Sequence, residues 1–217
     1  MKLIIVIATA IMLLFSVAYA QENSTITNEN QTMYDAIEKH SVQITSLNPG
    51  GGFCSGTVIS NEGNARVLTC KHCITPTEET WADDLKVRVI ITSASDDLAY
   101  LIMDGNYADK ISAKIALYRE QLKKEVYFYG KPGLTVRFPS SGKIIRYTDD
   151  WGWAVMPIIP GCSGSGLYNK EKELVGVVWG KMTEGGQMLG MGGTDIAVFE
   201  TLYDIRKFLR EVEQIIK

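Results

Sequence analysis

Short apolar runs alternate with polar turn residues along most of the chain. From residue 41 onward these runs are rich in Val, Ile, Tyr and Phe, and turns such as Asn-Pro-Gly and Lys-Pro-Gly break them. Such runs are typical of β-strands. The pattern predicts strands at residues 42–47, 53–60, 65–69, 86–92, 98–103, 114–117, 125–129, 135–138, 143–147, 153–158, 166–168, 174–179 and 195–198. Many short strands at this spacing favour barrels or a sandwich.

Only the end of the chain is clearly helical. Between residues 199 and 217, apolar residues such as Leu202, Phe208 and Val212 recur at helical spacing, with Lys and Glu between them. This spacing predicts an amphipathic helix. The charged stretch at residues 119–124 is the expected linker between two halves, residues 41–118 and 125–198.

The first residues have the pattern of a secretory signal peptide. A Met-Lys start precedes an apolar run, and Ala-Tyr-Ala at residues 18–20 fits a cleavage site. An uncleaved anchor is the alternative, but the apolar run is short for spanning a bilayer. We therefore expect residues 1–20 to be removed, a secreted or periplasmic location, and no stable membrane anchor. Residues 21–40, rich in Asn, Gln, Thr and Glu, are expected to form a flexible polar tail.

Composition narrows the function classes. The 217 residues include 22 Lys+Arg and 25 Asp+Glu, for a formal charge of −3. Nucleic-acid partners usually require a basic face, so none is expected. A hydrophobic share of 46% is too high for a disordered chain. Export to an oxidising compartment would allow the four Cys to form disulfides.

Three motifs carry candidate chemistry. Residues 68–73, Leu-Thr-Cys-Lys-His-Cys, place His72 directly after a predicted strand, and an imidazole, with an ordinary pKa of about 6.5, suits a general base. Residues 95–101 place Asp97 at a strand start, where its carboxylate could orient an imidazole. Residues 160–166, Pro-Gly-Cys-Ser-Gly-Ser-Gly, allow a tight turn that exposes Ser163 and aligns backbone N–H groups. Taken singly, these residues read equally as a structural histidine, a turn residue and a flexible loop.

Together, the motifs resemble those of the chymotrypsin-like (trypsin-fold) serine peptidases. Residues 53–59 and 68–73 look like that family's strand before the histidine and its Leu-Thr-Ala-Ala-His-Cys. Asp-Leu-Ala at residues 97–99 matches the family and favours Asp97 over Asp96. Gly-Cys-Ser-Gly at 161–164 resembles Gly-Asp-Ser-Gly, and Gly-Val-Val-Trp-Gly at 176–180 resembles Gly-Ile-Val-Ser-Trp-Gly. The resemblance spans residues 41–217 in the family's order.

The resemblance implies an all-β fold of two antiparallel β-barrels with a C-terminal α-helix. It also implies a serine endopeptidase that hydrolyses protein or peptide substrates through an acyl-enzyme, with no metal and no cofactor. Each site residue then has an expected role. The nucleophile is Ser163, the base His72 and its orienting acid Asp97; the oxyanion donors are the backbone N–H groups of Gly161 and Ser163; the substrate-binding residues are Val178, Trp179 and Gly180.

The sequence departs from the family at several positions. Cys162 stands where the family has the Asp that pairs with a freed N-terminus, which argues against activation by propeptide cleavage. Pro157 stands at the base of the specificity pocket, so no side-chain preference follows. The resemblance implies a disulfide between Cys54 and Cys73. A second disulfide between Cys70 and Cys162 is a further hypothesis. Cys70 lies two residues before the expected base, and Cys162 adjoins the expected nucleophile.

Two other functions remain open at this stage. Residues 70–73, Cys-Lys-His-Cys, also fit an exported thiol–disulfide oxidoreductase of the thioredoxin class. That chemistry needs a thiolate at the start of a helix, and no helical period follows the motif. The other alternative is a catalytically inactive, peptidase-like binding protein.

Overall fold

The computed structural model describes residues 28–46, 52–75, 79–133, 135–149, 151–183 and 195–216. The chain divides into two compact units, residues 1–33 and 34–217, and the fold below is that of the second. The predicted signal peptide at residues 1–20 lies outside the described residues. None of the helices in the described part of the chain is both long and apolar enough to cross a lipid bilayer.

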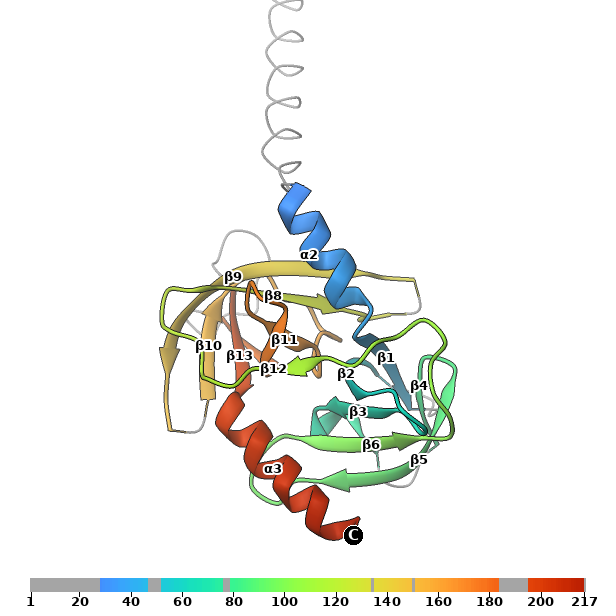
Figure 1. The fold of residues 1–217 in the computed structure, drawn as a ribbon. Helices are drawn as coiled ribbons and strands as arrows, with labels where there is room; N and C mark the ends of the chain where they lie inside the picture. Colours follow the sequence, from blue (N-terminus) through green and yellow to red (C-terminus); the bar gives the residue numbers. More distant parts are fainter. Residues whose placement is uncertain are drawn as a thin grey trace, which may run out of the picture. The chain divides into compact units, whose positions relative to one another are not determined.

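The first half of the chain forms a closed antiparallel barrel (Figure 1). Its strands follow one another around the barrel in the order β1-β2-β3-β6-β5-β4. Their bounds are β1 (Ser41–Ser46), β2 (Phe53–Ser60), β3 (Arg66–Thr69), β4 (Thr80–Ala82), β5 (Leu85–Thr92) and β6 (Ala99–Met103). Their inward side chains, among them Val42, Ile44, Val58, Val67 and Leu101, form one buried cluster.

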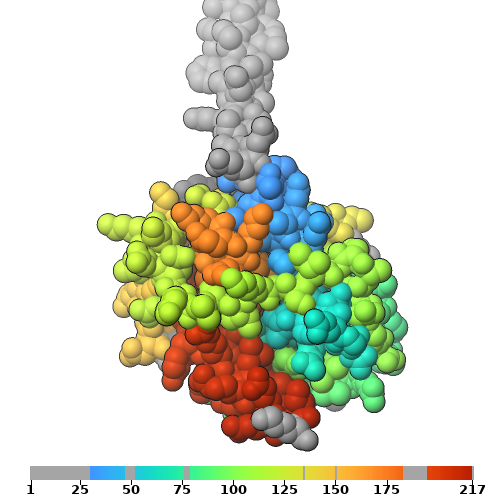
Figure 2. All heavy atoms as spheres, in the orientation of Figure 1, coloured from blue at the N-terminus to red at the C-terminus, as the bar shows by residue number. Residues whose placement is uncertain are grey.

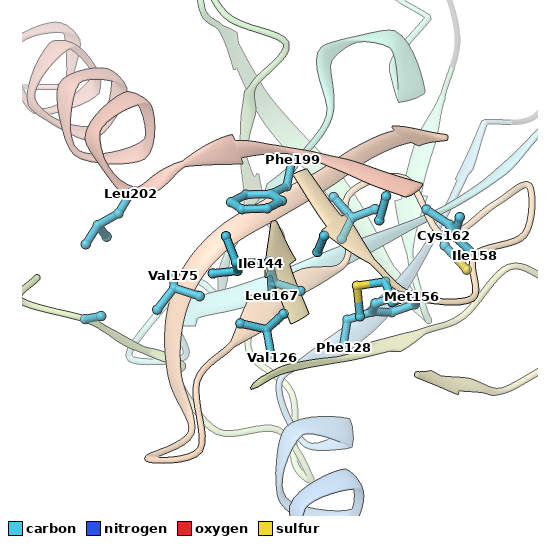
Figure 3. Close-up of a cluster of buried hydrophobic side chains, with 14 residues drawn as sticks. Val126, Phe128, Ile144, Met156, Ile158, Cys162, Leu167, Val175, Phe199 and Leu202 are labelled. Carbon is cyan, nitrogen blue, oxygen red and sulfur yellow. The ribbon is translucent and has the colours of Figure 1, made fainter. Parts of the chain in front are cut away.

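The second half forms a sheet of seven strands in the order β11-β8-β9-β10-β13-β12-β7, and a further β11–β12 pairing closes it into a barrel. The strands are β7 (Lys114–Ile115), β8 (Glu125–Gly130), β9 (Phe138–Tyr147), β10 (Trp151–Val155), β11 (Gly166–Tyr168), β12 (Glu173–Thr183) and β13 (Asp195–Thr201). Figure 3 shows Phe128, Ile144, Leu167 and Phe199 within the buried cluster of this barrel. The expected fold class, two antiparallel barrels and a C-terminal helix, is confirmed.

The C-terminal helix α3 (Leu202–Ile215) begins immediately after β13. Thr201 and Asp204 form a capping box, in which each side chain bonds the other residue's backbone N–H. Leu202, Ile205, Phe208 and Val212 form its buried face. Figure 2 shows the red atoms of α3 against the yellow-green segment that contains β7, where Arg206 donates to the carbonyl of Ala116.

The structure differs from the predicted elements at five places. A helix of 11 residues, α2 (Asn28–Glu38), lies in the segment expected to be a flexible tail, and its residue Ile37 is completely buried. β4 was not predicted. β7 pairs in parallel with β12 of the second barrel, so the chain has left the first barrel before the predicted linker at residues 119–124. Helix α3 begins three residues later than expected, because β13 continues to Thr201.

The fifth difference concerns β9, where the sequence predicts two strands separated by a Ser-Ser-Gly turn. The structure has one continuous strand, because Gly142 lies directly against the backbone of the neighbouring strand. A Cβ atom on Gly142 would be 2.0 Å from the carbonyl oxygen of Val155 and 2.4 Å from Cβ of Met156. This glycine therefore permits a close approach of two strands and does not break one.

We expect Gly142→Ala to lower the free energy of unfolding by about 1–3 kcal/mol, because the added methyl group meets backbone that cannot move aside. Gly52→Ala is the matched control, since a Cβ at Gly52 meets nothing within 4 Å. Thermal unfolding of both variants checks the prediction. Equal melting temperatures for the two variants would show that the strands can separate at no cost.

Candidate active site

The pairing of β3 with β6 brings His72 next to Asp97. Thr69 at the end of β3 faces Ala99 at the start of β6, so the short 3-10 turn Lys71–Cys73 lies beside the residues that precede β6. The His72 Nδ1 atom is 2.5 Å from Asp97 Oδ2, and the backbone N–H of His72 donates to Asp97 Oδ1 at 2.9 Å. Asp97 thus holds the imidazole and the backbone that carries it, and Nε2 is left for another partner.

The neighbouring carboxylate, Asp96, has a different environment. Its Oδ2 accepts hydrogen bonds from the hydroxyls of Ser93 and Ser95, and it pairs with Lys207 of α3 at 3.3 Å. Asp96 therefore stabilises its own loop. This agrees with the sequence-based choice of Asp97 as the partner of His72.

Two glycines with positive φ shape the turn that carries Ser163. The φ angles are +91° at Gly161 and +89° at Gly164, a region that strains side-chain-bearing residues. A Cβ on Gly164 would also lie 1.9 Å from the carbonyl oxygen of Ser55 in β2. Backbone bonds from Gly164 N to Val178 O, at 2.7 Å, and from Val178 N to Ser165 O, at 2.9 Å, fix the turn against β12.

The Ser163 hydroxyl points toward β12. It donates to the carbonyl oxygen of Trp179 at 3.1 Å, and among the described residues it has no hydrogen bond to His72. Ser163 nevertheless adjoins the histidine turn, because its carbonyl oxygen lies 3.8 Å from Cys73 Sγ. Rotation about the Cα–Cβ bond moves a serine hydroxyl between three staggered positions, and the bond to Trp179 O uses one of them.

Backbone donors converge at the same turn. The N–H of Cys162 bonds to Ile159 O and that of Gly164 to Val178 O. By contrast, the N–H groups of Gly161 and Ser163 donate to no acceptor among the residues that the structure describes. Two N–H groups without acceptors on one tight turn are the donors that an oxyanion needs.

Ser55 connects the turn that carries Ser163 to the first barrel. Its backbone N–H donates to Ser163 O at 2.7 Å, and its hydroxyl donates to Gly161 O at 2.9 Å. The same hydroxyl accepts the buried N–H of Lys131 at 2.9 Å. Ser55 was part of a matched motif in the sequence, but nothing in the sequence assigned it this role.

The expected substrate-binding residues divide into two kinds. Val178 is completely buried, and its carbonyl accepts from Gly164 N and from the Cys70 thiol. Pairing between Val178 and a bound peptide does not fit this burial. Trp179 and Gly180 are partly exposed, at a register shift in the pairing of β12 with β13.

A pocket of about 570 Å³ lies beside His72. The rings of Trp151 and Trp179 line it, with centroids 5.5 Å apart and an angle of 61° between their planes. The other lining residues are Ser95, Asp96, Asp97 and Glu200. Trp151 and Glu200 were not singled out from the sequence, since their position depends on pairing between distant strands.

Glu200 contacts the acid that holds His72. It is only 2% exposed, and its Oε1 accepts the backbone N–H of Asp97 at 3.1 Å. Burial raises the pKa of Glu200 to about 7, although the bond from Asp97 N–H lowers it, and the negative charges of Asp204, Asp96 and Asp97 raise it further.

The cysteines confirm one expected disulfide and contradict the other. Cys54 and Cys73 are bonded, which ties β2 to the turn that carries His72. Cys70 and Cys162 are both free and buried, so the predicted second disulfide is wrong. The Cys70 thiol donates to Val178 O at 3.2 Å, whereas Cys162 belongs to the buried cluster of the second barrel (Figure 3).

This arrangement also removes the oxidoreductase alternative. The two cysteines of the Cys-x-x-Cys motif are not partners, since Cys73 is bonded to Cys54. Burial raises the pKa of Cys70 well above the usual range for a thiol, so Cys70 is not the thiolate that exchange chemistry requires. Both barrels also lack the alternation of strands and helices found in the thioredoxin class.

Two groups of side chains around His72 have ligating atoms within 4.8 Å of one another. One contains Cys54 and Cys73, and the other contains Cys70 and Asp97. The sulfurs of the first group are bonded to each other, and in the second group the thiol is buried and the carboxylate already accepts two bonds from His72. We therefore assign no metal centre to either group.

Comparison with known proteins gives a family and a fold. The family model for the trypsin-like peptidase domain matches residues 54–177. No curated protein matched the chain. Among solved structures, Rv3671c from M. tuberculosis H37Rv, a Ser-to-Ala mutant in an inactive form, is 18% identical with a TM-score of 0.68, and the match covers 85% of this chain and 92% of that one.

The Rv3671c protease from M. tuberculosis in an active form is 20% identical with a TM-score of 0.67, and the match covers 82% of each chain. At this level of identity the two structural matches show the fold alone.

We expect Ser55→Ala to lower the free energy of unfolding by about 1–3 kcal/mol, because it leaves the buried N–H of Lys131 without an acceptor. Ser60→Ala is the matched control, since the Ser60 hydroxyl, on the same strand, makes no hydrogen bond to a described residue. Chemical denaturation of both variants measures the difference. Equal stability would show that solvent replaces the hydroxyl of Ser55.

Proposed function

Because the chain belongs to the trypsin-like peptidase domain family, we propose that it is a secreted serine endopeptidase that uses Ser163, His72 and Asp97. Its substrates are proteins or peptides, and the reaction passes through an acyl-enzyme. The observation that carries the proposal is the double attachment of His72 to Asp97, at Nδ1 and at the backbone N–H, beside the turn of Ser163. An imidazole whose side chain is 47% exposed contributes little to packing, so its attachment to Asp97 favours a chemical role.

The geometry supports a role for each group. The hydroxyl of Ser163 leaves Trp179 O, passes its proton to His72 Nε2 and attacks the carbonyl carbon of the substrate. Asp97 keeps the second imidazole proton on Nδ1 and stabilises the imidazolium that forms. His72 then donates a proton to the leaving amine, and a water molecule, deprotonated by His72, hydrolyses the ester on Ser163.

Negative charge develops on the carbonyl oxygen of the substrate when Ser163 attacks it, and again when water attacks the acyl-enzyme. The N–H groups of Gly161 and Ser163 make no hydrogen bond to a described residue, and they supply donors at the turn where that oxygen would lie. Such donors stabilise the transition state more than the ground state because they are already oriented. The Gly161 carbonyl accepts a hydrogen bond from the Ser55 hydroxyl at 2.9 Å. This bond keeps the peptide plane between Gly161 and Cys162 in one orientation.

An inactive, peptidase-like binding protein remains the second candidate, and one observation favours it. The Ser163 hydroxyl is bonded to Trp179 O, and for catalysis it must turn to His72. An active enzyme makes this rotation on substrate binding or spontaneously. A binding protein with the same residues would leave the serine unreactive.

We expect Ser163→Ala to reduce kcat for casein hydrolysis on the order of 10⁶-fold, the usual effect of losing a triad nucleophile. The melting temperature should change little, since the substitution removes one hydrogen bond of a half-buried hydroxyl. A fluorophosphonate should label the parent protein at Ser163, as mapped by mass spectrometry. Absence of labelling in a folded protein would favour the binding protein, and equal casein hydrolysis by variant and parent would remove Ser163 from the mechanism.

A further inference from the structure

The pocket beside His72 combines aromatic walls with buried negative charge. Trp151 of β10 and Glu200 of β13 are directly paired across the sheet, and the Trp151 ring contacts the Trp179 ring of β12 at a centroid distance of 5.5 Å. Asp96 and Asp97, from the loop before β6, line the same pocket. The pocket is thus built by both halves of the chain.

Most of the charges around the pocket already have partners. Asp97 is bonded to His72, and Asp96 pairs with Lys207. Asp204 is used by the capping box at the start of α3. Glu200 differs, because no cationic side chain of the described residues forms an ion pair with it. One of its oxygens accepts Asp97 N–H, and the other accepts no hydrogen bond from any residue that the structure describes.

Such a group has an unmet electrostatic requirement. A carboxylate that is 2% exposed and lacks a counter-ion is costly to ionise, and the raised pKa of Glu200 reflects this cost. A cation that entered the pocket would supply the missing charge. It would also lie beside two indole rings, and an indole ring attracts a cation through the negative potential above its face. An anionic or neutral guest gains neither interaction.

We propose that this pocket binds a lysine or arginine side chain of the peptide substrate, through Glu200 and the rings of Trp151 and Trp179. The ligand assignment rests on the proposed peptidase function, because His72 lines the same pocket and the side chain must come from a residue close to the scissile bond. Selection for a cationic side chain thus comes from the pocket beside His72. It does not depend on the position of Pro157, from which no charge preference follows.

The test uses pairs of fluorogenic peptides that differ at one position. An arginine is moved through each of the four positions on either side of the cleaved bond, and every arginine peptide is compared with its citrulline counterpart, which has the same shape and no charge. At one position the arginine peptide should be cleaved with a kcat/KM about tenfold or more higher. The ratio cancels any effect of a variant on chemistry that both peptides share.

Glu200→Gln should bring this ratio close to one, because glutamine keeps an oxygen for the N–H of Asp97 but carries no charge. A merely structural role of Glu200 would change both rates equally and leave the ratio intact. Glu213→Gln is the matched control, since Glu213 is exposed on α3 and does not line the pocket. That variant should keep the ratio of the parent enzyme.

The ratio should also increase as the pH rises from 6 to 8. Below its pKa of about 7 Glu200 is neutral and attracts a cation weakly, and above it the carboxylate is charged. Any effect of pH on chemistry that both peptides share cancels in the ratio. The charged or titratable groups that surround Glu200 are Cys70, His72, Asp96, Asp97, Asp204 and Lys207. Glu200→Gln should remove this pH dependence.

An unchanged ratio in Glu200→Gln would overturn the proposal. Two other results would also overturn it, and they are distinguishable. If peptides are cleaved but arginine and citrulline give equal kcat/KM at every position, the pocket does not select a cation and the peptidase function stands. If no peptide is cleaved and Ser163 is not labelled by a fluorophosphonate, the proposed function fails, and with it the assignment of this pocket to a substrate side chain.

Discussion

The turn that carries Ser163 depends on Ser55, a residue of the opposite barrel. Ser55 donates its backbone N–H to Ser163 O and its hydroxyl to Gly161 O, so one residue of β2 fixes both ends of the short segment 161–163. Gly164 has a positive φ at this contact. In addition, any side chain on it would clash with Ser55 O. The site can therefore form only when the second barrel is docked against the first.

The C-terminal segment makes the reciprocal connection. Glu200 at the end of β13 accepts the N–H of Asp97, and Lys207 of α3 bonds Ser95 and Asp96 in the same loop of the first barrel. The acid that orients His72 is thus held on one side by its own strand pairing and on the other by the last strand and helix of the chain. Helix α3 consequently does more than cover apolar surface, because it stabilises the loop that carries Asp97.

Much of this arrangement could be predicted from the sequence, for identifiable reasons. Short motifs specify local chemistry, and those around His72, Asp97 and Ser163 indicated which residues to examine. The family resemblance of these motifs implied the disulfide between Cys54 and Cys73, which is confirmed. Relations between distant strands leave no such local pattern. In the sequence, Glu200 is a single charged residue at the end of an apolar run. Only the pairing of β13 with β10 and β12 places its carboxylate against the backbone N–H of Asp97. Likewise, Gly142 resembles a turn residue until the neighbouring strand is known.

The expected Cys70–Cys162 disulfide shows where inference from chain proximity fails. The turns that carry His72 and Ser163 adjoin, and Cys70 and Cys162 lie within two residues of them, yet nearness of two turns does not bring every pair of their side chains together. The buried thiol of Cys70 is directed at Val178 O, while His72 follows it on an exposed 3-10 turn. Cys162 is adjacent to Ser163, but its side chain enters the core of the second barrel. The direction of each side chain therefore determines that these two thiols stay apart and serve as buried packing groups. The spacing of cysteines in the sequence does not encode that direction.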